Sequence, residues 1–132
     1  MASKKVLVTG ATGLVGQEVV KALIQKGDLV FAVTRNSKTK KKMSMQLIEG
    51  DLSKGKIVDD RFQDIDAVIH LMGENVGESR WTAERKKKIL DSRVLGTKHL
   101  YESLEQNKKL QVIVAASAIG YYGDRGDEEL NE

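Results

Sequence analysis

The sequence predicts an α/β protein with a doubly wound parallel sheet of about five strands in the order 3-2-1-4-5. Short apolar runs alternate along the chain with segments of helical hydrophobic spacing. The runs are apolar throughout, as in strands covered on both faces, and strands separated by helices pair in parallel through right-handed crossovers. A glycine-rich turn directly follows the first run, which completes a strand–turn–helix unit.

The first half of the chain supplies three strands and one helix. The strands are expected at residues 6–8, 29–33 and 46–49, the last being the weakest. The helix between the first two strands ends at Gly27, since glycine terminates the periodic pattern there. Its apolar positions are Val15, Val19, Ala22 and Leu23.

The second half repeats the alternation. A short helical segment around 58–62 precedes a fourth strand at 67–71, and a long helix over 82–105 precedes a fifth strand at 111–116. The inner side of the long helix is expected to contain Ile89, Val94, Leu95, Leu100 and Leu104.

The composition is that of one globular domain spanning residues 1–132. Apolar residues make up 40% and charged residues 31%, and no run approaches the ~20 apolar residues of a membrane-spanning helix. The basic start runs directly into glycines, so no secretory leader is expected. The absence of cysteine excludes disulfides and thiolate metal sites and fits a reducing cytoplasm. Two lysine runs, at 38–42 and 86–88, are interpreted as solvated surface rather than a nucleic-acid site.

The glycine turn has the pattern Gly10-x-x-Gly13-x-x-Gly16. Gly10 can adopt a positive φ, Gly13 lets a pyrophosphate approach the backbone, and Gly16 lets the helix approach the strand. Free N–H groups and the positive end of the helix dipole would then bind a diphosphate. The cofactor-binding residues expected here are Gly10, Thr12, Gly13, Leu14, Val15 and Gly16.

Two other interpretations of the turn stay open: a tight strand–helix connection that binds nothing, and the glycine turn of a methyltransferase. A P-loop is excluded because no Gly-Lys-Ser or Gly-Lys-Thr follows the glycines. The strand–turn–helix context favours dinucleotide binding by a Rossmann fold.

The end of the second strand indicates which dinucleotide is bound. An acidic residue there would accept hydrogen bonds from a ribose 2′-hydroxyl, whereas an arginine accommodates a 2′-phosphate. The chain has Thr34-Arg35-Asn36 at this place, without a carboxylate. A charge-assisted hydrogen bond from Arg35 contributes ~1.5–3 kcal/mol, so NADP(H) is preferred over NAD(H) unless Arg35 is only a surface cation.

Further segments extend the pattern beyond the glycine turn. They are residues 71–76, Arg80-Trp81-Thr82, 91–97 and 117–126. With the turn, they make the chain resemble the extended or atypical short-chain dehydrogenase/reductase superfamily, and within it a small epimerase-like family of NADP-binding proteins (sugar nucleotide epimerase-like or cell-division-inhibitor-like). Members of that family usually continue well past this length with a substrate-binding lobe, so the resemblance concerns their amino-terminal part.

The resemblance implies further site residues. Gly50-Asp51-Leu52 would lie beside the adenine, with the Asp51 carboxylate accepting from its amino group, and residues 71–73 would pass under the ribose and phosphates. The additional cofactor residues are therefore Asp51, Leu52, Leu71, Met72 and Gly73. Ser117 matches the superfamily's catalytic serine, whose hydroxyl binds the substrate oxygen; the alternative is a structural serine.

The chain also departs from the superfamily pattern. The proton-relay motif Tyr-x-x-x-Lys does not occur within residues 1–132, since none of the three tyrosines is followed by lysine four residues later. In the superfamily this motif lies downstream of the serine strand, beyond the part of the pattern that these residues cover. Tyr121 and Tyr122 are candidates for proton transfer, and an unperturbed tyrosine, with a pKa of about 10, would need a nearby cation for this. Arg93 occupies the position of the superfamily's helical asparagine.

His70 ends the fourth strand and is interpreted as a structural histidine with satisfied hydrogen bonds. No second histidine or carboxylate stands at metal-ligand spacing around it, so no metal is expected. His99 is expected on the surface or flank of the long helix. The polar loop after the fourth strand would either contact substrate or cofactor or anchor itself by packing; its residues are Glu74, Asn75, Arg80 and Trp81.

Two functions follow. The favoured one is the cofactor domain of an NADP-dependent oxidoreductase or epimerase-like enzyme acting on a carbonyl or carbinol of a small molecule or nucleotide sugar, with the 132-residue chain alone inactive. The alternative is a non-catalytic NADP-binding redox sensor or interaction module. The expected partners are a pyridine nucleotide and a small-molecule substrate, with no nucleic acid and no membrane. Because no helix follows the fifth strand, an uncovered sheet edge should cause self-association or reduced stability.

Overall fold

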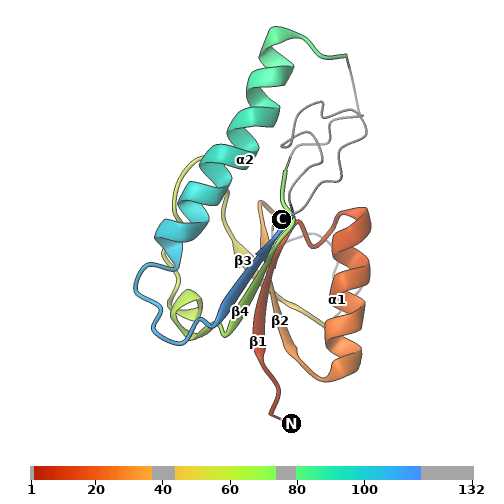
Figure 1. The fold of residues 1–132 in the computed structure, drawn as a ribbon, viewed down its shortest axis with the longest axis vertical. Coiled ribbons are helices and arrows are strands. Elements are labelled where there is room, and N and C mark those ends of the chain that lie inside the picture. Colours follow the sequence, from red (N-terminus) through yellow and green to blue (C-terminus); the bar gives the residue numbers. More distant parts are fainter. Residues whose placement is uncertain (1, 37–43, 74–79, 117–132) are drawn as a thin grey trace, which may run out of the picture.

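The computed structural model describes residues 2–36, 44–73 and 80–116, which form one sheet between two helices (Figure 1). The strands are β1 (Lys5–Thr9), β2 (Leu29–Thr34), β3 (Gln46–Glu49), β4 (Ala67–His70) and β5 (Val112–Ala115). The helices are α1 (Leu14–Lys26), the 3-10 helix η1 (Asp60–Asp64) and α2 (Ala83–Ser103).

The sheet has the order β3-β2-β1-β4-β5, and every pairing is parallel. Val8 of β1 is in register with Ala32 of β2 and Ile69 of β4. Figure 1 shows α1 and α2 on opposite faces of this sheet, so the predicted doubly wound architecture and strand order are confirmed. The order reverses at β1, and the carboxyl ends of β1 and β4 meet where such folds bind ligands.

Two apolar layers hold the sheet to its helices. Along β1, Val6 and Val8 face α1, whereas Leu7 between them faces the α2 side. This alternation of apolar residues on both faces explains why the strands read as continuous apolar runs. The α1 layer is formed by Val6, Val8, Ala11, Val20, Val30 and Ala32. The α2 layer is formed by Leu7, Phe31, Ile48, Leu52, Phe62, Ile65, Val68, Leu100 and Leu104.

The inner side of α2 differs from the prediction at one position. Val94 is 56% exposed, and the buried positions of the helix are Ser92, Gly96, Leu100 and Ser103. Because successive helical residues are rotated by about 100°, Val94 falls on the side opposite Gly96. Three of the four buried positions carry short, weakly apolar residues, and this is why the apolar pattern was misleading.

The short helical segment predicted around 58–62 begins later than expected. Val58 is 87% exposed and lies before η1, which starts after Asp59. The Asp59 carboxylate accepts a hydrogen bond from the Arg61 backbone N–H at 2.9 Å, a capping contact that fixes the start of the helix.

β5 lies at one edge of the sheet, where Val112, Ile113 and Val114 are 49%, 43% and 55% exposed. This agrees with the uncovered apolar strand expected from the sequence, whereas self-association through it stays a prediction. Among the described residues, no helix has the length and apolarity that crossing a membrane requires.

Candidate functional site

The turn after β1 depends on two close backbone approaches. Gly10 has a φ of +71°, and a Cβ there would lie 2.8 Å from the carbonyl carbon of Leu71 and 2.9 Å from the Met72 nitrogen. A Cβ at Gly16 would lie 2.0 Å from the Gly10 carbonyl oxygen. The turn therefore requires glycine at both positions, the first to turn the chain beside β4 and the second to bring α1 onto the turn.

The amino-terminal end of α1 is available for an anion. Gly13 is its N-cap, with no side-chain cap, and the first turn of the helix contains no acidic residue. The first N–H groups of an α-helix have no acceptor within the helix, and here they belong to a turn in which Leu14 and Val15 are 89% and 62% exposed. The Gly13 N–H itself donates to the Gly10 carbonyl at 3.1 Å, so it is not one of the N–H groups available to an anion.

A cleft of about 990 Å³ lies at the carboxyl ends of the strands. It brings together nine of the predicted cofactor residues, which are Gly10, Thr12, Gly13, Arg35, Asp51, Leu52, Leu71, Met72 and Gly73. Leu14, Val15 and Gly16 lie outside the cleft lining, in the first turn of α1. A diphosphate at this helix end would therefore meet their backbone rather than their side chains.

Asp51 is held by its own turn. Its Oδ1 accepts hydrogen bonds from the Ser53 backbone N–H at 3.0 Å and the Ser53 hydroxyl at 2.6 Å. Burial raises the pKa of the Asp51 carboxyl, but these bonds and the charges of Arg35 and Lys54 outweigh burial and lower it. The carboxylate is thus ionised at neutral pH, and its predicted contact with an adenine amino group would use Oδ2.

Leu52, unlike Asp51, does not offer its side chain to the cleft. Its side chain is 1% exposed and belongs to the apolar layer under α2, so only its backbone is suited to contact a ligand. Its carbonyl oxygen contacts Nδ1 of His99, which is half-buried on α2. The sequence placed His99 on the flank of the helix without a role; in the structure, this side chain ties α2 to the turn that carries Asp51.

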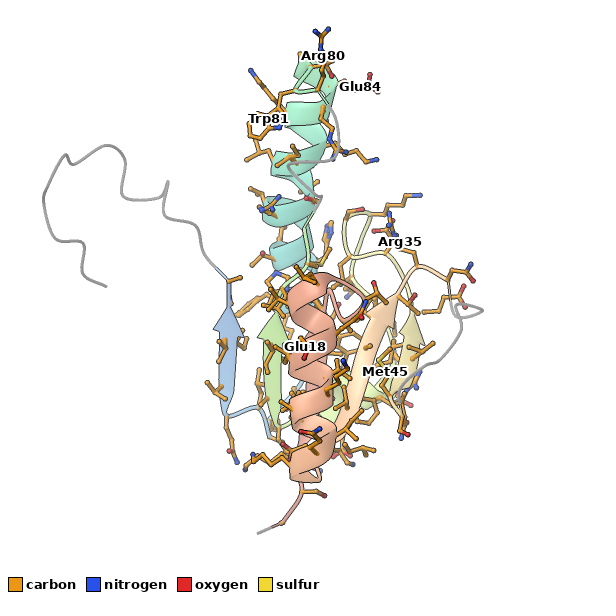
Figure 2. The ribbon with its side chains drawn as sticks, turned by 90° about the vertical axis from the view of Figure 1, so that its right-hand side faces the viewer. Glu18, Arg35, Met45, Arg80, Trp81 and Glu84 are labelled. Carbon is orange, nitrogen blue, oxygen red and sulfur yellow. The ribbon has the colours of Figure 1, made fainter. Side chains whose placement is uncertain are left out.

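Charged side chains of both signs line the cleft, four of them basic and three of them the carboxylates Asp51, Glu84 and Asp91. Arg35 lies just past the carboxyl end of β2 (Figure 2). Lys54, Lys87 and Lys88 line the same cleft, and Lys87 is paired with Asp91 at 2.9 Å. The α2 residues of this wall were not predicted, because their place depends on how far the helix extends past the sheet, as Figure 1 shows.

The described part of the predicted polar loop lies away from the glycine turn. Figure 2 shows Arg80 and Trp81 at the start of α2, at the end of the helix that points away from the sheet. Neither is in the cleft lining, and Trp81 is 56% exposed. Ser117, Tyr121 and Tyr122, as well as Glu74 and Asn75, lie outside the described residues.

His70 is buried, and both ring nitrogens have partners, which confirms the structural interpretation. Nδ1 lies 2.6 Å from the Thr9 hydroxyl and Nε2 lies 2.9 Å from the Thr97 hydroxyl. Burial lowers the pKa of His70, which favours the neutral ring. Thr9 was missed by the sequence analysis, although its position directly before Gly10 at the end of a buried strand is a usable signal.

Residues 6–132 match the model of the NAD dependent epimerase/dehydratase family. The chain belongs to this family. Membership confirms the resemblance read from the sequence, and it agrees with the helix end, glycine turn and cleft of this epimerase/dehydratase domain.

Individual relatives agree with this membership. The domain is 34% identical over 120 residues to Epimerase family protein SSP1921 of Staphylococcus saprophyticus, covering 90% of this chain and 39% of the relative. It superimposes on UDP-N-acetylglucosamine 4-epimerase from Bacillus cereus with a TM-score of 0.70 and 27% identity, over 98% of this chain and 40% of that one. A short-chain dehydrogenase/reductase superfamily protein from Agrobacterium tumefaciens, solved with bound NAD, gives a TM-score of 0.73 and 25% identity, over 96% of this chain and 36% of that one. The chain thus spans about two fifths of these proteins.

Proposed function

We propose that the chain is the cofactor-binding part of an NADP-dependent oxidoreductase or epimerase that acts on a carbonyl or carbinol carbon of a small molecule or nucleotide sugar. The observation that carries the proposal is the uncapped amino-terminal end of α1, which follows a glycine turn at the cleft. Its N–H groups would hold the diphosphate, Asp51 the adenine, and residues 71–73 the ribose. The nicotinamide ring supplies hydride transfer when it is bound.

The preference for NADP(H) rests on Arg35. It stands where a ribose 2′-hydroxyl would otherwise meet an acidic residue, and its charge is close enough to Asp51 to lower the pKa of that carboxyl. Lys54 adds a second cation in the same wall. A 2′-phosphate would be attracted by both, whereas NAD(H) has no group there to use them.

Substrate chemistry is assigned to residues 117–132. Ser117 would donate a hydrogen bond to the substrate oxygen, with Tyr121 or Tyr122 as the proton donor. The second candidate function is a non-catalytic NADP-binding sensor or interaction module. A cytoplasmic location, expected from the cysteine-free sequence, stays a prediction. NADPH oxidation over a panel of carbonyl compounds, with the chain extended to the length of its relatives, distinguishes the two functions.

Titration calorimetry with NADPH and NADH tests the proposal on the chain itself. NADPH should bind more tightly, and Arg35→Asp should weaken NADPH about ten- to hundredfold while leaving NADH within about threefold. Arg61→Asp is the matched control, since Arg61 pairs with Asp59 away from the cleft lining. Absence of binding by both nucleotides would overturn the proposal, and equal loss of both in Arg35→Asp would overturn the assigned role of Arg35.

A further inference from the structure

The Thr9 hydroxyl lies at the centre of a buried hydrogen-bond cluster. Thr9 is 1% exposed, and its Oγ1 accepts from the backbone N–H groups of Leu71 at 3.0 Å and Met72 at 3.2 Å. The same oxygen lies 2.6 Å from Nδ1 of His70, whose Nε2 lies 2.9 Å from the Thr97 hydroxyl on α2. The cluster therefore joins the ends of β1 and β4 to α2.

The number of donors decides where the protons lie. A hydroxyl has one proton to donate and two lone pairs to accept with. The Met72 N–H donates to Oγ1, and the Leu71 N–H is shared between Oγ1 and the Thr9 carbonyl oxygen, from which it lies 3.1 Å. With both N–H groups directed at its lone pairs, the Thr9 hydroxyl has its own proton left to donate to Nδ1 of His70. Nδ1 is then unprotonated, and the neutral ring carries its proton on Nε2 and donates it to Thr97.

We propose that His70 is a positioning residue for the dinucleotide: as the Nε2–H tautomer it fixes the Thr9 hydroxyl, which in turn fixes residues 71–73 in the cleft wall. This inference rests on the proposed function. His70 acts through Thr9 and has no part in the chemistry itself.

The fixed segment is the one that the glycine turn contacts. A Cβ on Gly10 would lie 2.8–2.9 Å from the Leu71–Met72 peptide, so the turn and this peptide lie too close together for any side chain to fit between them. Met72 is bounded on its other side by α2, since a Cβ on Gly96 would lie 3.0 Å from its Cε. If the Thr9 hydroxyl turned away, the Leu71 N–H would keep the Thr9 carbonyl as its acceptor, but the Met72 N–H would lose the Thr9 hydroxyl. The segment from Met72 onward could then move relative to the helix end that holds the diphosphate.

Protonation of His70 is incompatible with the cluster. A proton on Nδ1 would point at Thr9 and require its oxygen to accept a third hydrogen bond. Burial of the ring, which is 7% exposed, also lowers the pKa of His70 and so supports the neutral form.

The tautomer is measured on the ligand-free chain by two-bond ¹H–¹⁵N correlation spectra at neutral pH. We expect His70 to show Nδ1 at the shift of an unprotonated ring nitrogen and Nε2 at that of a protonated one. The reversed pattern, or an imidazolium, overturns the proposal. This result does not depend on nucleotide binding, so it is separate from the test of the proposed function.

The consequence for the cleft is measured by NADPH affinity. Thr9→Val should bind about tenfold more weakly, and Thr9→Ser, which keeps the hydroxyl, within about twofold of the parent. Thr97→Val makes the same change at the other ring nitrogen, where water can replace the exposed hydroxyl, and should cost less than about threefold. Parent-like binding by Thr9→Val overturns the proposal, whereas failure of the parent to bind NADPH overturns the proposed function.

A second pair of variants covers the case that Thr9→Val does not fold. His70→Asn places an amide oxygen near the position of Nδ1 and should keep affinity within about threefold. His70→Leu offers no acceptor and should bind about tenfold more weakly. Equal affinities for the two His70 variants would contradict the role given to Nδ1.

Discussion

Replacing Gly16 with alanine should destabilise the protein, because no space exists for a methyl group between α1 and the turn after β1. The new Cβ would lie 2.0 Å from the Gly10 carbonyl oxygen and 2.9 Å from Cα of Ala11. Both are backbone atoms, so relief requires α1 to withdraw by about 1 Å from a close-packed interface. Val20, fully buried on the same helix, would lose contacts as the helix moves.

The magnitude follows from two opposing effects. Overpacking a core costs ~1–3 kcal/mol, and a clash against backbone belongs at the upper end of that range. Alanine in a helix recovers up to about 1 kcal/mol over glycine. The net loss is therefore about 2 kcal/mol in the free energy of unfolding, or roughly 5–10 °C in Tm for a domain of this size.

Urea denaturation of the parent and Gly16→Ala chains measures this loss. Gly55→Ala is the control, since a Cβ there would have nothing within 4 Å, and its unfolding free energy should stay within about 0.5 kcal/mol of the parent. A Gly16→Ala chain as stable as the parent would refute the close approach of α1 to the turn.

Two further perturbations test contacts far from the cleft. Asn107 Nδ2 donates to the carbonyls of Phe62 at 2.7 Å and Ile65 at 3.0 Å, so Asn107→Ala should lower the free energy of urea unfolding by about 2 kcal/mol; unchanged stability would contradict this. Hydrogen bonds from Lys109 and Lys5 lower the pKa of Asp64 from 3.8 to about 2. The stability that this pairing contributes is present above pH 3.8 and lost as pH falls through about 2. Asp64→Asn should therefore be less stable than the parent at neutral pH and as stable as the parent in strong acid. A difference in stability between Asp64→Asn and the parent that persists at the lowest pH would show that it does not come from this pairing.

The parallel sheet with a helix on each face could be predicted because its strands carry apolar residues on both faces, as Val6, Leu7 and Val8 do. Such runs require covering helices and parallel pairing. The glycine turn could also be predicted, since two backbone segments lie so close together at Gly10 and at Gly16 that no side chain fits there. The apolar strands and the glycine turn are each formed by residues close together in the sequence, so the residues that explain them can be identified from the sequence alone.

Other features depend on contacts between distant segments. The pairing of Thr9 with His70 follows from the register of β1 and β4, which places these two residues side by side. The buried face of α2 was misjudged at Val94 because the helix packs through Ser92 and Gly96, which carry no apolar signal. The buried side chain of Leu52 likewise depends on where α2 lies relative to the turn after β3.

Several glycines at or beside the cleft stand where a side chain would meet a neighbouring segment. A Cβ would lie within 3.0 Å of a neighbour at Gly10, Gly16 and Gly96, and 2.9 Å from the guanidinium carbon of Arg93 at Gly73. Three of the four approaches involve residues 71–73 of the cleft lining, whereas the approach at Gly16 brings α1 onto the glycine turn outside the lining. At Gly10 and Gly16 the nearest atoms belong to the backbone, so a larger residue there must shift a backbone segment. At Gly73 and Gly96 the nearest atoms are the ends of the Arg93 and Met72 side chains, which can move aside. Shortening an exposed cation such as Lys54 removes charge and leaves the wall in place. Affinity lost through added volume should fall alike for NADPH and NADH, and affinity lost through removed charge should fall for NADPH alone, which separates shape from charge in any series of variants.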